Sequence, residues 1–162
     1  MATTNKLPIE IFMPPNMLKA KVGGPNVTID ASMIRRAEAV LEDLKTEFGT
    51  WIAADVEKLV DARDRFAALC DNATRGELFR GAHDLRGGAK TYEYPLIGRV
   101  AASLSRLIEG TEKPDAIPLA LVDAHVHAIK VMLRQDIKDP SNRTALHLAE
   151  ELEARVTERL EA

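Results

Sequence analysis

The 162-residue sequence lacks several features by which a protein class is often recognised. It holds a single cysteine, so neither a disulfide framework nor a thiolate metal cluster is expected within it. Aromatic residues make up only 4%, which favours helix over sheet. The formal net charge of -3 argues against a general nucleic-acid binder, and no apolar run suggests a signal segment or a membrane span. These absences predict a cytoplasmic protein that binds neither nucleic acid nor membrane.

What the sequence does contain is typical of one globular domain preceded by a different segment. Hydrophobic residues make up 46% and charged residues 29%, a balance found in folded rather than disordered chains. Gly23-Gly24 and four prolines interrupt the first 28 residues, so no continuous helix is expected there. We interpret residues 1–28 as an extended arm that packs on the body or on a partner, with a loosely ordered tail as an equal alternative. Residues 29–162 are expected to form a single helical domain.

Apolar residues recur at helical spacing from Asp30 almost to the end of the chain. Asp30 and Ser141 are the expected N-caps of the first and last helices, and Asp139-Pro140 is expected to stop the fifth. The triplet Phe48-Gly49-Thr50 either interrupts the first helix or lies in a bend through which it continues. Because short connections favour antiparallel neighbours, we expect an all-α fold: an antiparallel four-helix bundle core with additional helices and the extended N-terminal arm. The expected helices cover about residues 30–48, 50–69, 74–92 and 95–110. A fifth carries its apolar positions at residues 121–133 and runs to the stop at Asp139-Pro140, and a last one follows Ser141.

The strongest functional signal lies within residues 81–90, in the third expected helix. Positions three and four apart are neighbours on a helix, so His83, Arg86 and Gly87 share one face. The apolar stripe of the same helix lies on the other side, at Leu78, Ala82, Leu85, Ala89 and Tyr92. His83 and Arg86 are therefore expected to face solvent, on a surface that also holds Gly76, Arg80 and Lys90.

These residue types suit a phosphoryl group. A neutral imidazole is a competent nucleophile near pH 7, and histidine serves in covalent catalysis. Phosphoryl transfer asks mainly for in-line positioning and for compensation of oxygen charge, which Arg86 can supply as a permanent cation. Arg80 and Lys90 add longer-range attraction, because cations outnumber acidic residues by two over residues 75–90. Since each glycine in a helix interior costs about 1 kcal/mol relative to alanine, Gly87-Gly88 indicates a gap that lets another protein approach.

A structural alternative stays open for the same residues. A surface histidine usually has no chemical role, and a histidine three residues before an arginine is a weak motif. Gly87-Gly88 can also end a helix. Against this, the apolar stripe continues in phase through Ala89 and Tyr92, and no turn signal follows until Tyr94-Pro95. On spacing alone, both interpretations stand.

The segment Ala82-His83-Asp84-Leu85-Arg86-Gly87-Gly88-Ala89 resembles the signature of the histidine-containing phosphotransfer (HPt) family, Ala-His-x-Leu-Lys/Arg-Gly-Ser/Gly-Ala. The resemblance covers about residues 77–109 and extends to the flanking helices only by general pattern. It implies a four-helix bundle that exposes one histidine midway along a helix. It also implies that His83 accepts the phosphoryl group, that Arg86 stabilises its charge, and that Gly87 admits the partner.

The resemblance implies partners as well. An HPt protein takes a phosphoryl group from a sensor histidine kinase or a receiver domain and passes it to an aspartate of a response-regulator receiver domain. Such proteins need no cofactor of their own, since the Mg²⁺ ion belongs to the receiver, so we expect a phosphocarrier rather than an enzyme. The alternative is a pseudo-HPt, a helical interaction module without phosphotransfer. The residues expected to contact the partner are Gly76, Arg80, Asp84, Gly88 and Lys90.

Two residues depart from the family pattern. Asp84 replaces the small or polar residue more usual after the histidine, and we expect it to tune partner choice. Glu93 stands where a glycine often ends the helix, which puts the helix boundary in question rather than the phosphosite. Because the arm and the last helix exceed a minimal four-helix carrier, either of them is a candidate surface for a homodimer.

The remaining chemistry-bearing residues are expected to be structural or solvated. His125 and His127 are two positions apart and point in different directions on a helix, which argues against a metal-binding pair. His125 neighbours an apolar stripe and is expected to be structural, whereas His127 is expected to contact solvent. His147 lacks a carboxylate–histidine motif, and Cys70 is expected to be a buried thiol. We therefore expect no metal or cofactor site.

Overall fold

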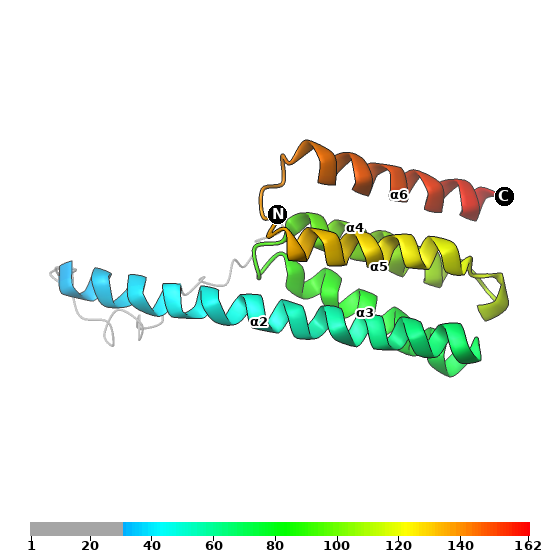
Figure 1. The fold of residues 1–162 in the computed structure, drawn as a ribbon, viewed down its shortest axis with the longest axis horizontal. Helices are drawn as coiled ribbons and strands as arrows, with labels where there is room; N and C mark the ends of the chain where they lie inside the picture. Colours follow the sequence, from blue (N-terminus) through cyan, green and yellow to red (C-terminus); the bar gives the residue numbers. More distant parts are fainter. Residues whose placement is uncertain (1–30) are drawn as a thin grey trace, which may run out of the picture. The chain divides into compact units, whose positions relative to one another are not determined.

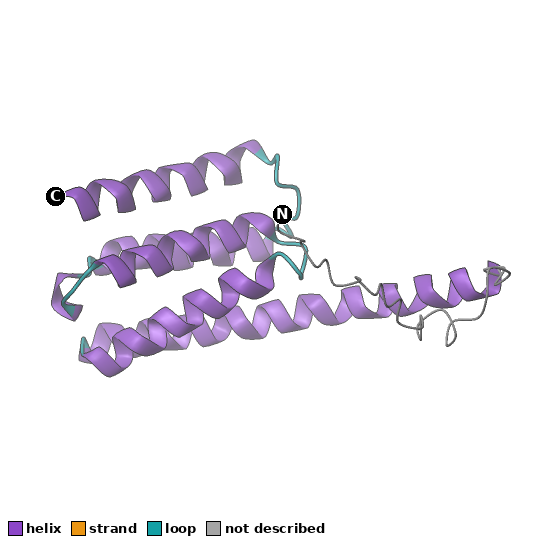
Figure 2. Ribbon diagram, turned by 180° about the vertical axis from the view of Figure 1, so that it is seen from behind, coloured by secondary structure: helices purple, strands orange, loops and turns teal. Residues whose placement is uncertain are grey.

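The structure is a computed structural model that describes residues 31–162, so the expected arm of residues 1–28 lies outside the described residues. The chain divides into two compact units, Met1–Val40 and Leu41–Ala162. Residues 31–162 contain helices and connections but no strand, which confirms the all-helical class (Figures 1 and 2). The helices are α2 (Ala31–Leu69), α3 (Asn72–Ala89), α4 (Pro95–Gly110), the 3₁₀ turn η1 (Pro114–Ala116), α5 (Leu119–Arg134) and α6 (Arg143–Glu161).

Helix α2 runs through Phe48-Gly49-Thr50 without a break, so the continued helix is the correct alternative. A Cβ atom at Gly49 would meet nothing within 4 Å, so packing does not require glycine at this position. From Ile52 onward α2 buries one face in the core, and Leu59 of that face is fully buried. Burial of this face stabilises the helix beyond what local propensity supplies.

Helix α3 begins at Asn72 because Asp71 caps it. The Asp71 carboxylate accepts a hydrogen bond from the Thr74 backbone N–H at 2.8 Å, and the Thr74 hydroxyl accepts one from the Asp71 backbone N–H at 3.2 Å. This reciprocal pair is a capping box, with threonine in the third position. The predicted start at Thr74 is therefore two residues late.

The end of α3 also differs from the prediction, since the helix stops at Ala89 rather than Tyr92. Glu93 adopts a left-handed backbone conformation with φ 68°, and the Tyr94 N–H donates to the Ala89 carbonyl at 2.8 Å. This is the geometry in which helices commonly end on glycine. Glu93 thus takes a backbone conformation that glycine adopts more readily.

The prediction for α4 is confirmed at both ends, with Pro95 in its first turn and Gly110 as its last residue. Helix α5 ends at Arg134, before the predicted stop at Asp139-Pro140. The cause is Asp136, which has φ 49° and lies in a turn where the Ile137 N–H donates to the Met132 carbonyl at 3.0 Å. This closed turn ends the helix before the proline can act.

The cap of α6 was predicted one residue too early. Asn142, not Ser141, is the N-cap, because its side-chain oxygen accepts a hydrogen bond from the Ala145 N–H at 3.1 Å. Ser141 instead donates from its backbone and hydroxyl to the carboxylate of Asp139, at 2.8 and 2.7 Å. Two neighbouring residues are both good caps, and the path of the connection decides between them.

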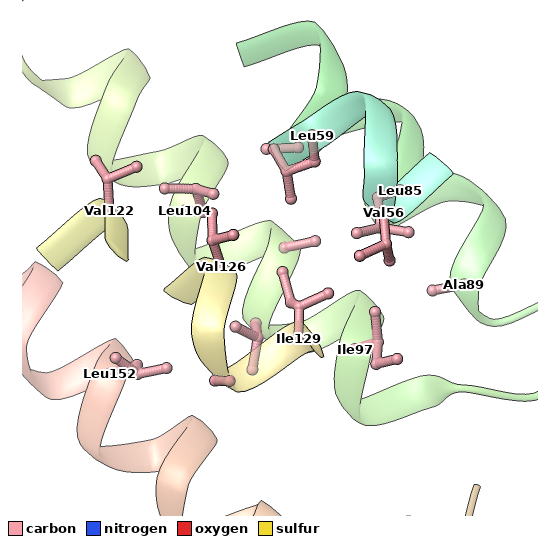
Figure 3. Packing of buried hydrophobic residues seen from close by; sticks show 14 of the residues in the cluster. Val56, Leu59, Leu85, Ala89, Ile97, Leu104, Val122, Val126, Ile129 and Leu152 are labelled. Carbon is pink, nitrogen blue, oxygen red and sulfur yellow. The ribbon is translucent and has the colours of Figure 1, made fainter. Parts of the chain in front are cut away.

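The hydrophobic core draws residues from α2, α3, α4, α5 and α6 (Figure 3). Ion pairs between helices accompany it at the surface. Arg99 of α4 makes a bidentate contact with Glu153 of α6, at 2.6 and 2.7 Å, and Arg63 of α2 pairs with Asp123 of α5 at 2.5 Å.

Within residues 31–162, every helix falls short of the length and apolar character that crossing a membrane requires. The fully buried large residues of the core include Ile52, Leu59, Leu78, Leu85, Ile97, Leu104, Ile129 and Met132.

Candidate functional site

His83 lies midway along α3 on the face opposite to the core. Burial follows the helical spacing of the apolar stripe: Ala82 and Leu85 are fully buried, whereas His83 is exposed. Figure 3 shows Leu85 and Ala89 of the same helix pointing into the core. The exposed position that the stripe predicts for His83 is confirmed, while its chemical role stays a prediction. Tyr92, expected to complete the stripe, is only half-buried because it lies beyond the end of the helix.

The imidazole of His83 is accessible for chemistry. Its ring lies against that of Phe79, one helical turn earlier, at 5.7 Å between ring centroids and an interplanar angle of 37°. Among residues 31–162, no group forms a hydrogen bond with either ring nitrogen of His83. Phe79 therefore restricts one side of the ring, and both nitrogens stay available to a partner. Sequence reasoning did not single out Phe79, although it stands four residues before the histidine.

The cations around His83 fall into two groups. Arg80, Arg86 and Lys90 are exposed, and the described part of the chain offers none of them an ion-pair partner. Arg75 is different, because its guanidinium donates to the carbonyls of Ile108 and Thr111 at 2.8 and 2.7 Å. It thus binds the C-terminal end of α4, where a cation is favourable. Arg75 therefore does not belong to the group of exposed cations around His83.

The two glycines after Arg86 have different surroundings. A Cβ atom at Gly87 would meet nothing within 4 Å, so this position is an open gap beside His83. A Cβ at Gly88 would lie 2.9 Å from the ring of Tyr92, which is too close for a real contact. Gly87 therefore leaves space at the surface, whereas Gly88 is explained by packing against Tyr92. At Gly76 a Cβ would lie at an ordinary 3.6 Å from the Arg80 guanidinium.

Helix α2 adds a charged pair beside Asp84 that sequence reasoning missed. Lys58 donates to the carboxylate of Asp55 at 2.8 Å, and this hydrogen bond is the main reason why the pKa of Lys58 is raised. Attraction to Tyr92 and Asp84 makes smaller contributions to the same rise. Asp84 is thus close enough to α2 for its charge to act on Lys58. Asp55 and Lys58 form an ordinary pair three residues apart on one helix. That spacing does not show that the pair lies near α3.

A hollow of about 340 Å³ lies next to Phe79, between the start of α3 and the end of α4. Arg75, Gly76 and Phe79 line it from α3, and Ile108 and Glu109 line it from α4. The hollow lies on the Gly76 side of His83. It is a concave region beside the exposed side chains that surround His83.

The other histidines have different environments. His125 is fully buried between α4 and α5, with Nδ1 at 2.7 Å from the Leu121 carbonyl and Nε2 at 3.0 Å from the Ser103 hydroxyl. Burial lowers the pKa of His125, which favours the neutral ring. His127 and His147 are exposed. The predicted burial of His125 and exposure of His127 are confirmed.

Cys70 corrects one expectation, because it is exposed rather than buried. It has φ 49° in the connection between α2 and α3, where the chain leaves the core. Among residues 31–162, no three His, Cys, Asp or Glu side chains come together in a way that could hold a metal ion.

Comparison with known proteins adds no family to this picture. No protein-family model matches the chain, and no curated protein and no solved structure matches it either. The resemblance of residues 82–89 to the HPt signature therefore stays a prediction that rests on the residues themselves.

Proposed function

We propose that this protein is a phosphocarrier of the HPt type, in which His83 accepts a phosphoryl group from one partner and passes it to another. The observation that supports this proposal is the constellation on α3. His83 is exposed with both ring nitrogens available, Arg86 is an exposed cation one turn along, and Gly87 leaves an open gap. In this proposal, α2, α3, α4 and α5 form the four-helix bundle of the carrier, and α6 is an addition to it.

The transfer step follows from the chemistry of these groups. A neutral imidazole nitrogen attacks the phosphorus of an aspartyl phosphate on a receiver domain, so that an N–P bond forms as the P–O bond to the carboxylate breaks. The aspartate carboxylate leaves with the electron pair, and the reverse step regenerates the free imidazole. Arg86 attracts the phosphoryl oxygens throughout, and the Mg²⁺ ion stays with the receiver. The protein supplies position and charge, while the partner supplies the rest of the catalysis.

The partner surface in this proposal surrounds His83. Arg80 and Lys90 extend the positive charge along α3, which favours an acidic receiver face. Asp84 interrupts this charge on the α2 side, beside Lys58, and would disfavour partners that place an acidic residue there. Gly76 and the hollow beside Phe79 accommodate a protruding side chain of the partner. Gly88 takes no direct part, because Tyr92 packs against it.

The second candidate is a pseudo-HPt that binds its partner through the same surface without phosphotransfer. A buried or hydrogen-bonded His83 would favour this alternative. The exposed ring of His83 instead favours the carrier, since His125 in the same chain shows how a structural histidine is held.

The deciding experiment measures phosphorylation with and without a protein partner. Phosphoramidate, a small donor with a P–N bond, tests the reactivity of the histidines, and phosphorylated receiver domains or active kinases test transfer. We expect an acid-labile phosphate that mass spectrometry maps to His83 and that His83→Gln removes. His127→Gln is the matched control, because His127 is exposed on α5 and lies outside the proposed surface.

Two results would count against the carrier. If phosphoramidate labels His83 no faster than His127, then Arg86 and Gly87 provide no special environment. If His83 is labelled by phosphoramidate but phosphorylated receivers and kinases transfer nothing to it, while a known phosphotransfer protein accepts from them, the interaction module is the better description.

A further inference from the structure

Reactive histidines are commonly oriented by a hydrogen bond, and the ring of His83 makes none within residues 31–162. In such sites the second ring nitrogen donates to a carboxylate or a carbonyl, and this bond fixes the direction of the first nitrogen. An exposed side chain changes rotamer within nanoseconds, and phosphoryl transfer depends on in-line positioning. An oriented His83 therefore needs a contact of another type.

The ring of Phe79 provides such a contact. It lies one turn before His83 on α3, with 5.7 Å between the ring centroids and 37° between the ring planes. Aromatic rings about 4.5–7 Å apart attract each other beyond the effect of the area that they bury. Helical side chains lean toward the N-terminus of their helix, so the imidazole is directed back over the turn that carries Phe79. The contact thus follows from a spacing of four residues on one helix.

Phe79 is itself held in place. Its side chain is half-buried and packs against the hydrophobic core, in contrast to the exposed His83. It also lines the hollow to which Ile108 of α4 contributes. An aromatic ring of this size has only two side-chain torsions, so packing against the core leaves it little freedom. A ring that the core fixes therefore lies against a ring that solvent alone would leave mobile.

We propose that Phe79 is a positioning residue for phosphoryl transfer, because its anchored ring holds the imidazole of His83 in one orientation. Phe79 precedes His83 by one turn of α3, whereas Arg86 and Gly87 follow it by one turn. The imidazole is thus flanked by an aromatic ring on one side and by a cation and a gap on the other. Phe79 closes the first side, so that the reacting nitrogen receives the phosphoryl group on the second. This role rests on the proposed carrier function, since Phe79 acts on the reaction only through His83.

The first experiment observes the His83 ring by nuclear magnetic resonance of the full chain. We expect nuclear Overhauser effects between the ring protons of Phe79 and His83, and side-chain couplings that show one dominant χ1 rotamer of His83. Phe79→Leu keeps an apolar side chain against the core and should leave His83 averaged over several rotamers. Phe79→Tyr keeps the ring and should preserve the single rotamer. An averaged His83 in the wild type overturns the proposal, whether or not any partner phosphorylates this protein.

The second experiment measures the rate at which phosphoramidate labels His83. Phe79→Leu should be labelled about tenfold more slowly, because a misplaced reacting group loses the advantage of orientation, and Phe79→Tyr should restore the rate. Phe66→Leu is the matched control. It also removes a ring, but Phe66 is 2% exposed in the core on α2, so this variant should lose stability and keep the wild-type rate. Wild-type labelling in Phe79→Leu, or equally slow labelling in Phe66→Leu, contradicts the positioning role.

The double variant Phe79→Leu with Arg86→Ala tests whether both residues act on the same step. If Phe79 directs the imidazole to the side of Arg86, the double variant should be slowed by less than the product of the two single effects. Effects that multiply fully overturn the proposed direction. A His83 that is held in one rotamer, but takes no label from phosphoramidate, phosphorylated receivers or kinases, refutes the carrier function and leaves Phe79 no role in transfer.

Discussion

His83 and His125 occupy the two extremes that a helical domain offers a histidine. His83 is exposed on α3 with both ring nitrogens available, and its neighbours are cations and a gap. His125 is fully buried on α5, and both of its nitrogens are bound, one to a backbone carbonyl and one to Ser103. The fold thus holds one histidine ring through burial and two hydrogen bonds and leaves the other open to solvent. Chemistry and stability should therefore separate cleanly between the two positions.

The largest expected effect is on phosphorylation. His83→Gln should abolish phosphoryl uptake and leave the free energy of unfolding within about 0.5 kcal/mol of the wild type, because the side chain contributes little packing. Mass-spectrometric site mapping and denaturant unfolding measure the two quantities. Arg86→Ala should slow uptake without changing stability, and an unchanged rate would remove the role proposed for Arg86.

The opposite pattern is expected at His125. His125→Ala should lower the free energy of unfolding by about 2–4 kcal/mol, because it leaves a cavity and an unpaired Ser103 hydroxyl. Labelling of His83 should persist under conditions where the variant is folded. Thermal and urea unfolding check the stability. A loss as small as that of His127→Ala would show that the buried hydrogen bonds are not important for stability.

His125 should also make the free energy of unfolding depend on pH, and this effect is smaller than that of removing the ring. Burial lowers its pKa in the folded state, so the unfolded chain binds the proton first as the pH falls. The stabilising effect of the neutral ring is complete above the ordinary histidine pKa of about 6.5 and is lost as the pH falls toward the lower folded value. Urea unfolding between pH 7.5 and 5.5 should show this decline in the wild type and in His127→Gln. In His125→Gln the decline should be weaker.

The two glycines beside His83 sharpen the comparison within α3 itself. Gly87→Ala should raise the free energy of unfolding by about 1 kcal/mol, because alanine favours helix and meets nothing there. Gly88→Ala should gain less or lose stability, since its Cβ would approach the Tyr92 ring. If Gly87 provides access for a partner, Gly87→Leu should slow transfer from a phosphorylated receiver more than it slows labelling by phosphoramidate. Equal slowing would contradict a role in protein access.

The smallest expected effect is at the end of α3. Glu93→Gly should stabilise the protein by up to about 1 kcal/mol, because glycine adopts the left-handed conformation without steric cost. Thermal unfolding measures the change. A loss of stability would show that the Glu93 side chain contributes more than its backbone conformation costs.

Local signals predicted much of this fold because they act within a few residues. The apolar stripe of α3, Pro95 in the first turn of α4 and Gly110 at its end are all readable in the sequence, since helix periodicity and proline geometry are local. The errors arose where two local signals competed. Asn142 and Ser141 are both suitable caps, and Asp136 turns the chain before Asp139-Pro140 is reached.

The face of α3 on which the candidate site lies could be read from the sequence. The stripe placed His83 and Arg86 on the solvent side of a helix because helical spacing leaves no other choice. Which residues of other helices adjoin that face could not be read in the same way. Arg75 binds the end of α4, Tyr92 packs against Gly88, and the charge of Asp84 acts on Lys58 of α2. These relations depend on how separate helices pack, and the order of residues along one helix carries no information about its neighbours.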